Sequence, residues 1–245
     1  MNLIIDIGNT RIKSAIFDRQ NQMLAFENFN NNQAIEKIEE LIQNHSPDFA
    51  IISEVGKKIE GLDKLLTSNK IKFFYLNHRL RLPFTIDYKT PSSLGADRMA
   101  LVAGAIFHQP EGNKLIIDAG TCITYDFIDG KNIYLGGAIS PGIKLRFQSL
   151  NNYTDKLPLI NEQNIDNIDL IGQSTKASIE TGVIYGIINE IEGFIVKYNL
   201  KYKNLTIFLT GGSQKVLDRY IKNKIFVNSK FLLLEGMNFI LNLNK

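Results

Sequence analysis

Leu3-Ile4-Ile5-Asp6 and Leu115-Ile116-Ile117-Asp118 are two copies of one four-residue string, and each is followed by a small polar turn. The first copy continues as Ile7-Gly8-Asn9-Thr10 and the second as Ala119-Gly120-Thr121-Cys122. A continuous apolar run predicts a buried strand, and an acid followed by glycine predicts a sharp turn where phosphate or metal can approach backbone amides. Two such turns, one in each half, indicate a duplicated nucleotide site.

The segments after each string predict further strands and helices in alternation. Each turn leads into a second apolar stretch, residues 12–17 or 123–128, so both halves begin as β-hairpins. Later apolar patterns alternate between helix and strand, which predicts an α/β fold. The first expected helix has the apolar face Ile35, Ile38, Leu41 and Ile42 and ends at His45-Ser46-Pro47. The other expected helices are 59–66, 95–108 and 175–198, the last with Ile179, Val183, Ile187, Ile191 and Ile195 on one stripe. The expected strands are 49–52, 71–75, 134–139 and 205–209, and the expected long loop is 83–94. A loop at 108–113 separates two expected lobes, residues 1–113 and 114–245.

Composition and charge narrow the class of protein. The chain has 245 residues, 44% of them hydrophobic, which suffices for packed interiors. Its formal net charge is only +3 and its Lys and Arg residues form no dense run, so neither nucleic acid nor a membrane is an expected partner. No apolar run reaches the ~18 residues of a membrane span. With one cysteine, Cys122, and no signal peptide pattern, a cytoplasmic location is expected.

Glycine-bearing segments lie at or beside the ends of several predicted strands. Besides the two Asp-x-Gly turns they are Gly136 to Gly142 and Thr210-Gly211-Gly212-Ser213. Glycine permits positive φ and close backbone approach, and short Thr, Asn and Ser side chains reach phosphate oxygens. Neither the Walker pattern nor Gly-x-Gly-x-x-Gly with a downstream acid occurs, which excludes P-loop and Rossmann sites.

On these motifs the chain resembles the type III pantothenate kinases of the actin, Hsp70 and sugar kinase superfamily. The motifs occur in the family's order: Asp6-x-Gly8-Asn9-Thr10, Tyr88 with Gly95-Ala96-Asp97-Arg98, Asp118-Ala119-Gly120-Thr121, Gly137-x-Ile139-x-Pro141-Gly142, Tyr153-Thr154-x-Lys156-Leu157-Pro158, Gly172-x-Ser174-Thr175 and Thr210-Gly211-Gly212. The resemblance implies duplicated actin-like (ribonuclease H-like) lobes with mixed sheets and a nucleotide cleft between them. It also implies ATP-dependent phosphorylation of pantothenate to 4'-phosphopantothenate, the first step of coenzyme A biosynthesis.

Asp97 is the candidate catalytic base, because phosphoryl transfer needs one group to accept the hydroxyl proton. It lies at the start of a predicted helix, whose dipole keeps a carboxylate ionised. The alternative for Asp97 is an ordinary helix cap. Arg98 beside it can pair with an anion, and the alternative for Arg98 is an ordinary surface arginine. By resemblance, pantothenate is bound by Tyr88, Gly95, Ala96, Asp97, Arg98 and Thr175. Loop packing for Tyr88 and a helix N-cap for Thr175 are the structural alternatives.

The resemblance also implies the cofactors and the residues that hold them. ATP is expected at Asp6, Ile7, Gly8, Asn9, Thr10, Arg11, Ile12, Lys13 and Thr121. Asp6 is expected to organise Mg²⁺ through water, and Asp118 to bind a monovalent cation, potassium or ammonium. The roles of Lys13 and of Glu54, which stands where the family usually has small apolar residues, are left open. A homodimer is expected through the helix 175–198, where Gly182 and Gly186 permit close approach of a second helix.

Two other functions remain possible at this point. One is a sugar or amino sugar kinase of the same superfamily, although such kinases commonly carry Asp-x-Gly-Gly-Thr where this chain has Asn9. The other is a nucleotide-binding regulator without catalysis, which would have no chemical need of Asp6, Asp97 and Asp118 together. Both features favour the pantothenate kinase.

Overall fold

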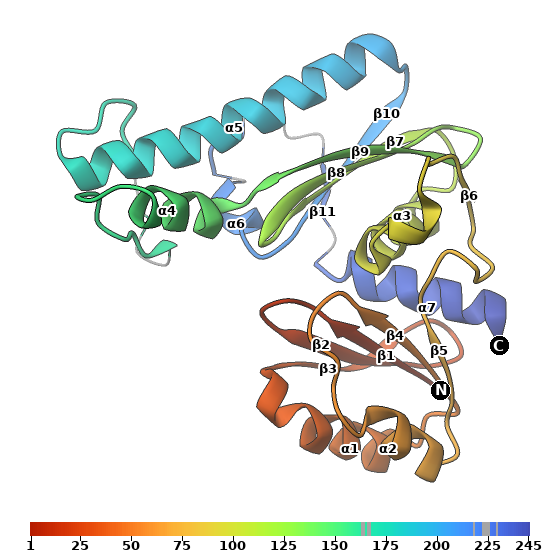
Figure 1. The fold of residues 1–245 in the computed structure, drawn as a ribbon. Coiled ribbons are helices and arrows are strands. Elements are labelled where there is room, and N and C mark those ends of the chain that lie inside the picture. The colour runs from red at the N-terminus through yellow and green to blue at the C-terminus, as the bar shows by residue number, and fades with distance from the viewer. Residues whose placement is uncertain (163–164, 166–167, 218, 222–225, 229) are drawn as a thin grey trace. The chain divides into compact units, whose positions relative to one another are not determined.

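The two Leu-Ile-Ile-Asp strings form central strands of two sheets in the computed structural model (Figure 1). The structure describes residues 1–162, 165, 168–217, 219–221, 226–228 and 230–245. The first string lies in β1 (Asn2–Ile7) and the second in β7 (Asn113–Ala119), and the Leu and Ile side chains of both are fully buried. The apolar runs are therefore buried strands, as the sequence predicted.

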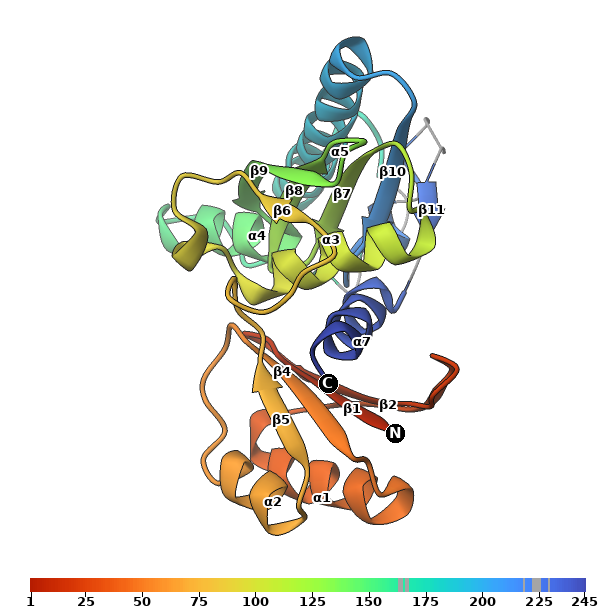
Figure 2. The same cartoon turned by 90° about the vertical axis from the view of Figure 1, so that its right-hand side faces the viewer.

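The first sheet has the strand order β3-β2-β1-β4-β5. Its other strands are β2 (Ile12–Phe17), β3 (Met23–Phe29), β4 (Phe49–Glu54) and β5 (Lys72–Tyr75). Strand β1 pairs antiparallel with β2 and parallel with β4, so the sheet is mixed and the predicted hairpin is present. Helices α1 (Ala34–His45) and α2 (Leu62–Ser68) cover one face, and α7 (Leu232–Asn244) packs on β1, β2 and β4 from the other (Figure 2).

The second sheet repeats this order and adds one strand. Its order is β11-β10-β7-β8-β9-β6, with β8 (Cys122–Ile128), β9 (Ile133–Pro141), β10 (Leu205–Thr210), β11 (Phe226–Asn228) and β6 (Thr85–Ile86). Strands β7, β10 and β11 pair in parallel, as β1, β4 and β5 do. The duplicated string thus reflects a duplicated sheet topology.

Long helices complete the two halves. Helix α5 (Thr175–Lys201) buries the predicted stripe of Ile179, Val183, Ile187, Ile191 and Ile195 in one core with β7, β8 and β10, and α4 (Ile143–Asn152) packs against it. The short α6 (Gln214–Leu217) follows β10. Helix α3 (Ala96–His108) crosses α7 in backbone contact, because a side chain at Gly104 would strike the Leu232 carbonyl and one at Gly236 the Ala100 carbonyl.

Some predicted boundaries were wrong, for local reasons. Helix α2 begins at Leu62 rather than at residue 59, because Gly61 takes a left-handed φ of 83° that a helix cannot contain. The expected loop at 83–94 contains β6, which pairs with β9, and a 3₁₀ turn, Pro91–Ser93. Strand β3 and helices α4 and α7 were not predicted.

By contact density the chain forms two compact units. The first comprises residues 1–111, 128–136 and 231–245, and the second comprises 112–127 and 137–230. The first division lies close to the expected lobe boundary at residue 113. Two later segments join the first unit because α7 packs on the first sheet and β9 begins beside β6. The division into lobes 1–113 and 114–245 stays a prediction.

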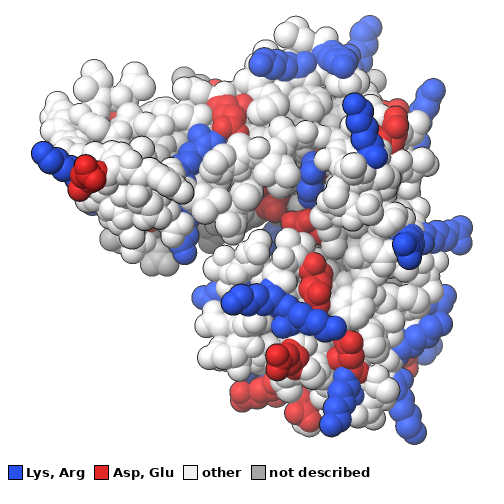
Figure 3. Space-filling model, in the orientation of Figure 1, with Lys and Arg blue, Asp and Glu red and all other residues white. Residues whose placement is uncertain are grey.

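The charged surface and the hydrophobicity of the helices were predicted from composition and can be compared with the structure. Basic and acidic side chains are both spread over the face shown in Figure 3. Among the described residues, no helix is long and apolar enough to cross a membrane.

Candidate active site

Asp6 lies between two polar neighbours on adjacent strands. The strand registers place Lys13 of β2 and Ser53 of β4 directly beside it. Asp6 is 5% exposed, and burial raises the pKa of its carboxyl from the ordinary 3.8 to about 6, although Lys13 and Ser53 lower it. The carboxylate is ionised at neutral pH, but its surroundings do not fully compensate for the burial, so a cation beside it would stabilise the folded protein.

The turn after Asp6 exposes polar side chains beside that carboxylate. The amide of Gly8 donates to the Arg11 carbonyl at 3.1 Å, and the amide of Gly56 donates to the Ile7 carbonyl at 2.8 Å. Gly56 lies against the Gly8 carbonyl so closely that no side chain fits there. Asn9, Thr10 and Arg11 are exposed, whereas Ile7 and Ile12 are buried in the core. Of the residues predicted to bind ATP here, the two isoleucines can offer only their backbones.

Asp97 occupies the first turn of α3 but is not its cap. The N-cap is Gly95, and the Asp97 carboxylate accepts the amide of Arg98 at 2.8 Å while lying over Gly95. Asp97 is therefore not the N-cap residue, although its carboxylate does satisfy one amide of the first helical turn. Asp97 and Asp6 belong to the same compact unit, and the charge of Asp97 contributes to raising the pKa of Asp6. The fold thus brings two predicted site residues from distant parts of the sequence near each other.

Arg98 and Tyr88 each had a structural alternative, a surface position for Arg98 and loop packing for Tyr88. Arg98 is only 7% exposed, so a surface arginine is the wrong interpretation. The half-buried ring of Tyr88 lies 6.1 Å from that of Tyr134. A side chain at Gly136, where φ is 102°, would come within 3.3 Å of the Tyr88 ring. Tyr88 therefore packs in its loop, and this packing leaves its role toward a substrate open.

The second turn, after Asp118, belongs to the second unit and is enclosed by two glycine segments. Asp118 pairs in register with Thr210 at the end of β10, and the following Gly211 (φ 101°) lies against the Asp118 carboxylate and the Ala119 backbone. The amide of Gly142 donates to the Thr121 carbonyl at 3.0 Å. Thr121 itself is exposed. Asp118 and Thr121 thus lie at the same turn, and their roles stay predictions.

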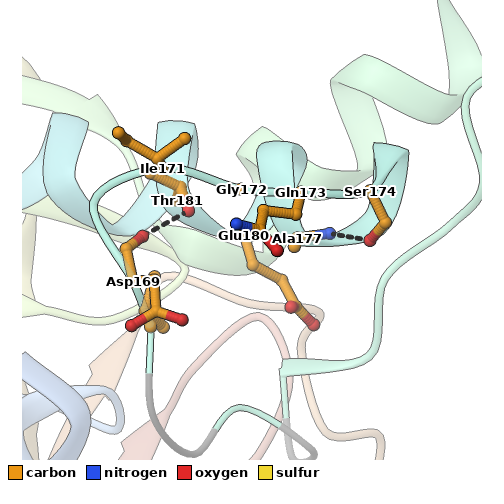
Figure 4. A pocket seen from close by; sticks show the side chains of 9 residues that line it. Asp169, Ile171, Gly172, Gln173, Ser174, Ala177, Glu180 and Thr181 are labelled. Atoms are coloured by element: carbon orange, nitrogen blue, oxygen red, sulfur yellow. Dashed lines mark hydrogen bonds between the residues drawn. The ribbon is translucent and has the colours of Figure 1, made fainter.

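A pocket of about 230 Å³ lies at the start of α5 (Figure 4). Its lining includes Gly172, Gln173 and Ser174 of the predicted Gly-x-Ser-Thr motif, together with Asp169 and Glu180. The helix cap is Ser174, whose hydroxyl accepts the Ala177 amide at 3.2 Å. The N-cap alternative for Thr175 is therefore wrong by one residue, because Thr175 already begins the helix. Thr175 is exposed.

Sequence reasoning missed Ser53 as a member of the site. It is fully buried, and among the described residues its hydroxyl has no hydrogen-bond partner of ordinary geometry, yet it lies near enough to Asp6 to lower the pKa of that carboxyl. The available signal was the polar Ser53-Glu54 pair at the end of an apolar strand. Glu54 is exposed, so the buried serine is the member that faces the site.

The family of this chain follows from its similarity to known proteins. A family model described as type III pantothenate kinase matches residues 2–197. The chain belongs to the type III pantothenate kinase family. A type III pantothenate kinase from Flavobacterium psychrophilum is 45% identical to it over 239 residues, which cover 97% of each chain. As a pantothenate kinase the chain is an enzyme that phosphorylates pantothenate, the first step of coenzyme A biosynthesis, and the predicted function is confirmed.

Solved structures show that this pantothenate kinase shares its fold with more distant proteins. A structure from Campylobacter jejuni, described as a Baf family transcriptional activator, is 24% identical and covers 98% of this chain and 97% of its own, with a TM-score of 0.63. One from Sinorhizobium meliloti, described as a 2-dehydro-3-deoxygalactonokinase, is 14% identical, covers 98% and 95%, and has a TM-score of 0.58. With the duplicated mixed sheets, these similarities confirm the predicted α/β fold class.

Proposed function

We propose that Asp97 is the general base that accepts the proton of the primary hydroxyl of pantothenate. It lies in the first turn of α3, and the Arg98 amide donates to one of its oxygens, which fixes the orientation of the carboxyl group. Phosphoryl transfer requires the base and the phosphate-binding turn to be near each other. The observation that supports the proposal is that Asp97 lies in the same compact unit as Asp6 and that its charge helps to raise the pKa of Asp6.

We propose that the turn after Asp6 binds the phosphates of ATP and, as a separate contact, that Thr121 binds ATP. Asn9, Thr10 and Arg11 are exposed beside a buried carboxylate whose charge is incompletely compensated, which suits Mg²⁺ held by Asp6 through water. Among the described residues no group of three or more His, Cys, Asp or Glu side chains could hold a metal ion. A single carboxylate is consistent with Mg²⁺, because this ion usually keeps several waters and binds phosphate oxygens. The ion would neutralise phosphate charge during transfer.

The substrate side of the proposal concerns the neighbours of Asp97. Buried Arg98 suits the carboxylate of pantothenate, because a desolvated guanidinium binds a carboxylate strongly. Gly95 and Ala96 would approach the substrate with their backbones, and Tyr88 would offer its hydroxyl. Thr175 would contribute from the start of α5.

The monovalent cation is a separate proposal that rests on Asp118. Gly211 lies against this carboxylate, and in the proposed site the carboxylate would face nucleotide phosphates of the same sign. Potassium or ammonium between them would relieve that repulsion.

We further propose that the enzyme is a homodimer that assembles through α5. Val196 and Leu200 are 49% and 84% exposed on this helix, and Gly182 faces open space among the described residues. Gly186 is different, because Arg146 of the same chain lies 3.8 Å from the position that its side chain would take. Gly182→Glu, rather than a change at Gly186, is therefore the substitution expected to split the dimer, as judged by light scattering. A variant that keeps the wild-type mass would contradict this surface.

A cytoplasmic location is proposed because the enzyme would draw on cellular ATP. The experiment for the proposed activity measures ADP release with pantothenate and with a panel of sugars, in potassium and Mg²⁺. We expect ADP release with pantothenate only, and release slowed by about 10²-fold or more in Asp97→Asn. Equal release with a sugar would contradict the substrate, and full activity of Asp97→Asn would contradict the base.

A further inference from the structure

Glu190, near the middle of α5, collects hydrogen bonds from three other elements of the second unit. Its Oε1 accepts the Tyr125 hydroxyl of β8 at 2.8 Å and the Ser140 hydroxyl of β9 at 2.5 Å. Its Oε2 accepts Nη2 of Arg146, on α4, at 2.5 Å. One carboxylate of α5 therefore links two strands of the sheet and the neighbouring helix α4.

Arg146 connects this cluster to the turn after Asp118. Its Nε donates to the Pro141 carbonyl at 2.8 Å. The next residue, Gly142, donates its amide to the Thr121 carbonyl at 3.0 Å, and it lies against the Gly120 and Thr121 carbonyls so closely that no side chain fits. A chain of contacts thus runs from Glu190 through Arg146 and the Pro141-Gly142 turn to Thr121.

The ion pair within this chain is stronger than an ordinary surface pair. The side chains of Arg146 and Glu190 are only 22% and 24% exposed. Burial alone would raise the pKa of Glu190, but the hydrogen bonds from Ser140, Arg146 and Tyr125 outweigh it and lower the pKa. A carboxylate with three donors and a guanidinium that binds both a carboxylate and a carbonyl hold a defined geometry. Such a pair can fix the position of the backbone that it contacts.

We infer that Arg146 and Glu190 are positioning residues that hold the Gly120-Thr121 turn in place for the nucleotide. The inference rests on the proposed contact between this turn and ATP. Neither residue belongs to the motifs that pointed to the family. Loss of the Arg146 contacts would free the Pro141-Gly142 turn and allow the Thr121 backbone to move, so ATP binding would weaken. Pantothenate binding, assigned to residues of the first unit and to Thr175, would change little.

The test compares Arg146→Lys and Glu190→Gln with the control Tyr125→Phe. A lysine keeps the charge near Glu190, but its single ammonium cannot reproduce the planar two-partner geometry of arginine. A glutamine keeps the shape of Glu190 but turns either a neutral oxygen or an amide donor toward Arg146. The control removes one donor to Glu190 and leaves the Arg146 contacts intact. Each protein is titrated with ATP and with pantothenate by calorimetry, and its melting temperature is measured.

We expect about a tenfold weaker ATP affinity in Arg146→Lys and in Glu190→Gln, with pantothenate affinity within twofold of wild type. Tyr125→Phe should bind ATP within twofold of wild type even if it melts earlier. The inference is overturned if the first two variants bind ATP like wild type, or if all three lose affinity in step with melting temperature. A wild-type protein that binds ATP but does not phosphorylate pantothenate would contradict the proposed activity and leave this comparison intact. One that binds no ATP would overturn both.

Discussion

Replacement of Asp6 by asparagine should stabilise the protein while abolishing its activity. Asp6 is buried, and its pKa is about 6 in the folded protein against 3.8 ordinarily. At about 1.4 kcal/mol per pH unit, this difference means that the charged carboxylate costs the folded state roughly 3 kcal/mol at neutral pH. Asparagine has nearly the same shape and no charge, so it removes this cost.

The sign of the pH dependence follows from a raised carboxyl pKa. As the pH falls, the folded protein takes up a proton on Asp6 near pH 6, before the unfolded chain does near 3.8, so the wild type gains stability relative to the variant. The advantage of Asp6→Asn should therefore be full above about pH 7 and absent below about pH 4. For a chain of this size, roughly 3 kcal/mol corresponds to about 6 to 12 °C in melting temperature.

The assay is thermal unfolding of both proteins from pH 4 to pH 8 in the presence of EDTA, since a bound cation would itself favour the wild-type carboxylate. Glu54→Gln is the matched control, because Glu54 is an exposed acid close to the site and should leave the melting temperature unchanged. A variant that is no more stable than wild type at pH 8, or equally more stable at pH 4, would refute the reasoning.

Three further predictions concern other parts of the molecule. Asp97→Asn should lower turnover by about 10²-fold or more while calorimetry still detects pantothenate binding; near wild-type turnover would mean that Asp97 is not the base. Activity should fall when sodium replaces potassium at constant ionic strength, and Asp118→Asn should reduce that difference; equal wild-type rates in both salts would argue against the ion. Gly236→Ala should destabilise the protein by about 1 to 3 kcal/mol in urea unfolding, because the methyl group meets the Ala100 carbonyl at the crossing of α3 and α7. Glu39→Ala, at an exposed position of α1, is its control, and equal stability of the two variants would refute the packing explanation.

The sequence by itself determined the features that depend on local pattern. Continuous apolar runs marked β1 and β7, and the spacing of Ile179, Val183 and Ile187 marked the buried stripe of α5. The acid and glycine at the end of each run marked the two polar turns. The strands and the stripe can be predicted because burial imposes a regular spacing on apolar residues along the chain, whichever element they pack against.

The tertiary structure decided which residues meet. Strand β3 alternates exposed and buried residues irregularly, so only its pairing with β2 defines it as a strand. The parallel register of β1 and β4 places Ser53 beside Asp6, and the packing of α4 on α5 places Arg146 rather than a second helix near Gly186. Such contacts join segments that are distant in the chain. A local pattern records that a side chain is buried, but the identity of its neighbour depends on register and helix packing, which arise only when the sheets assemble.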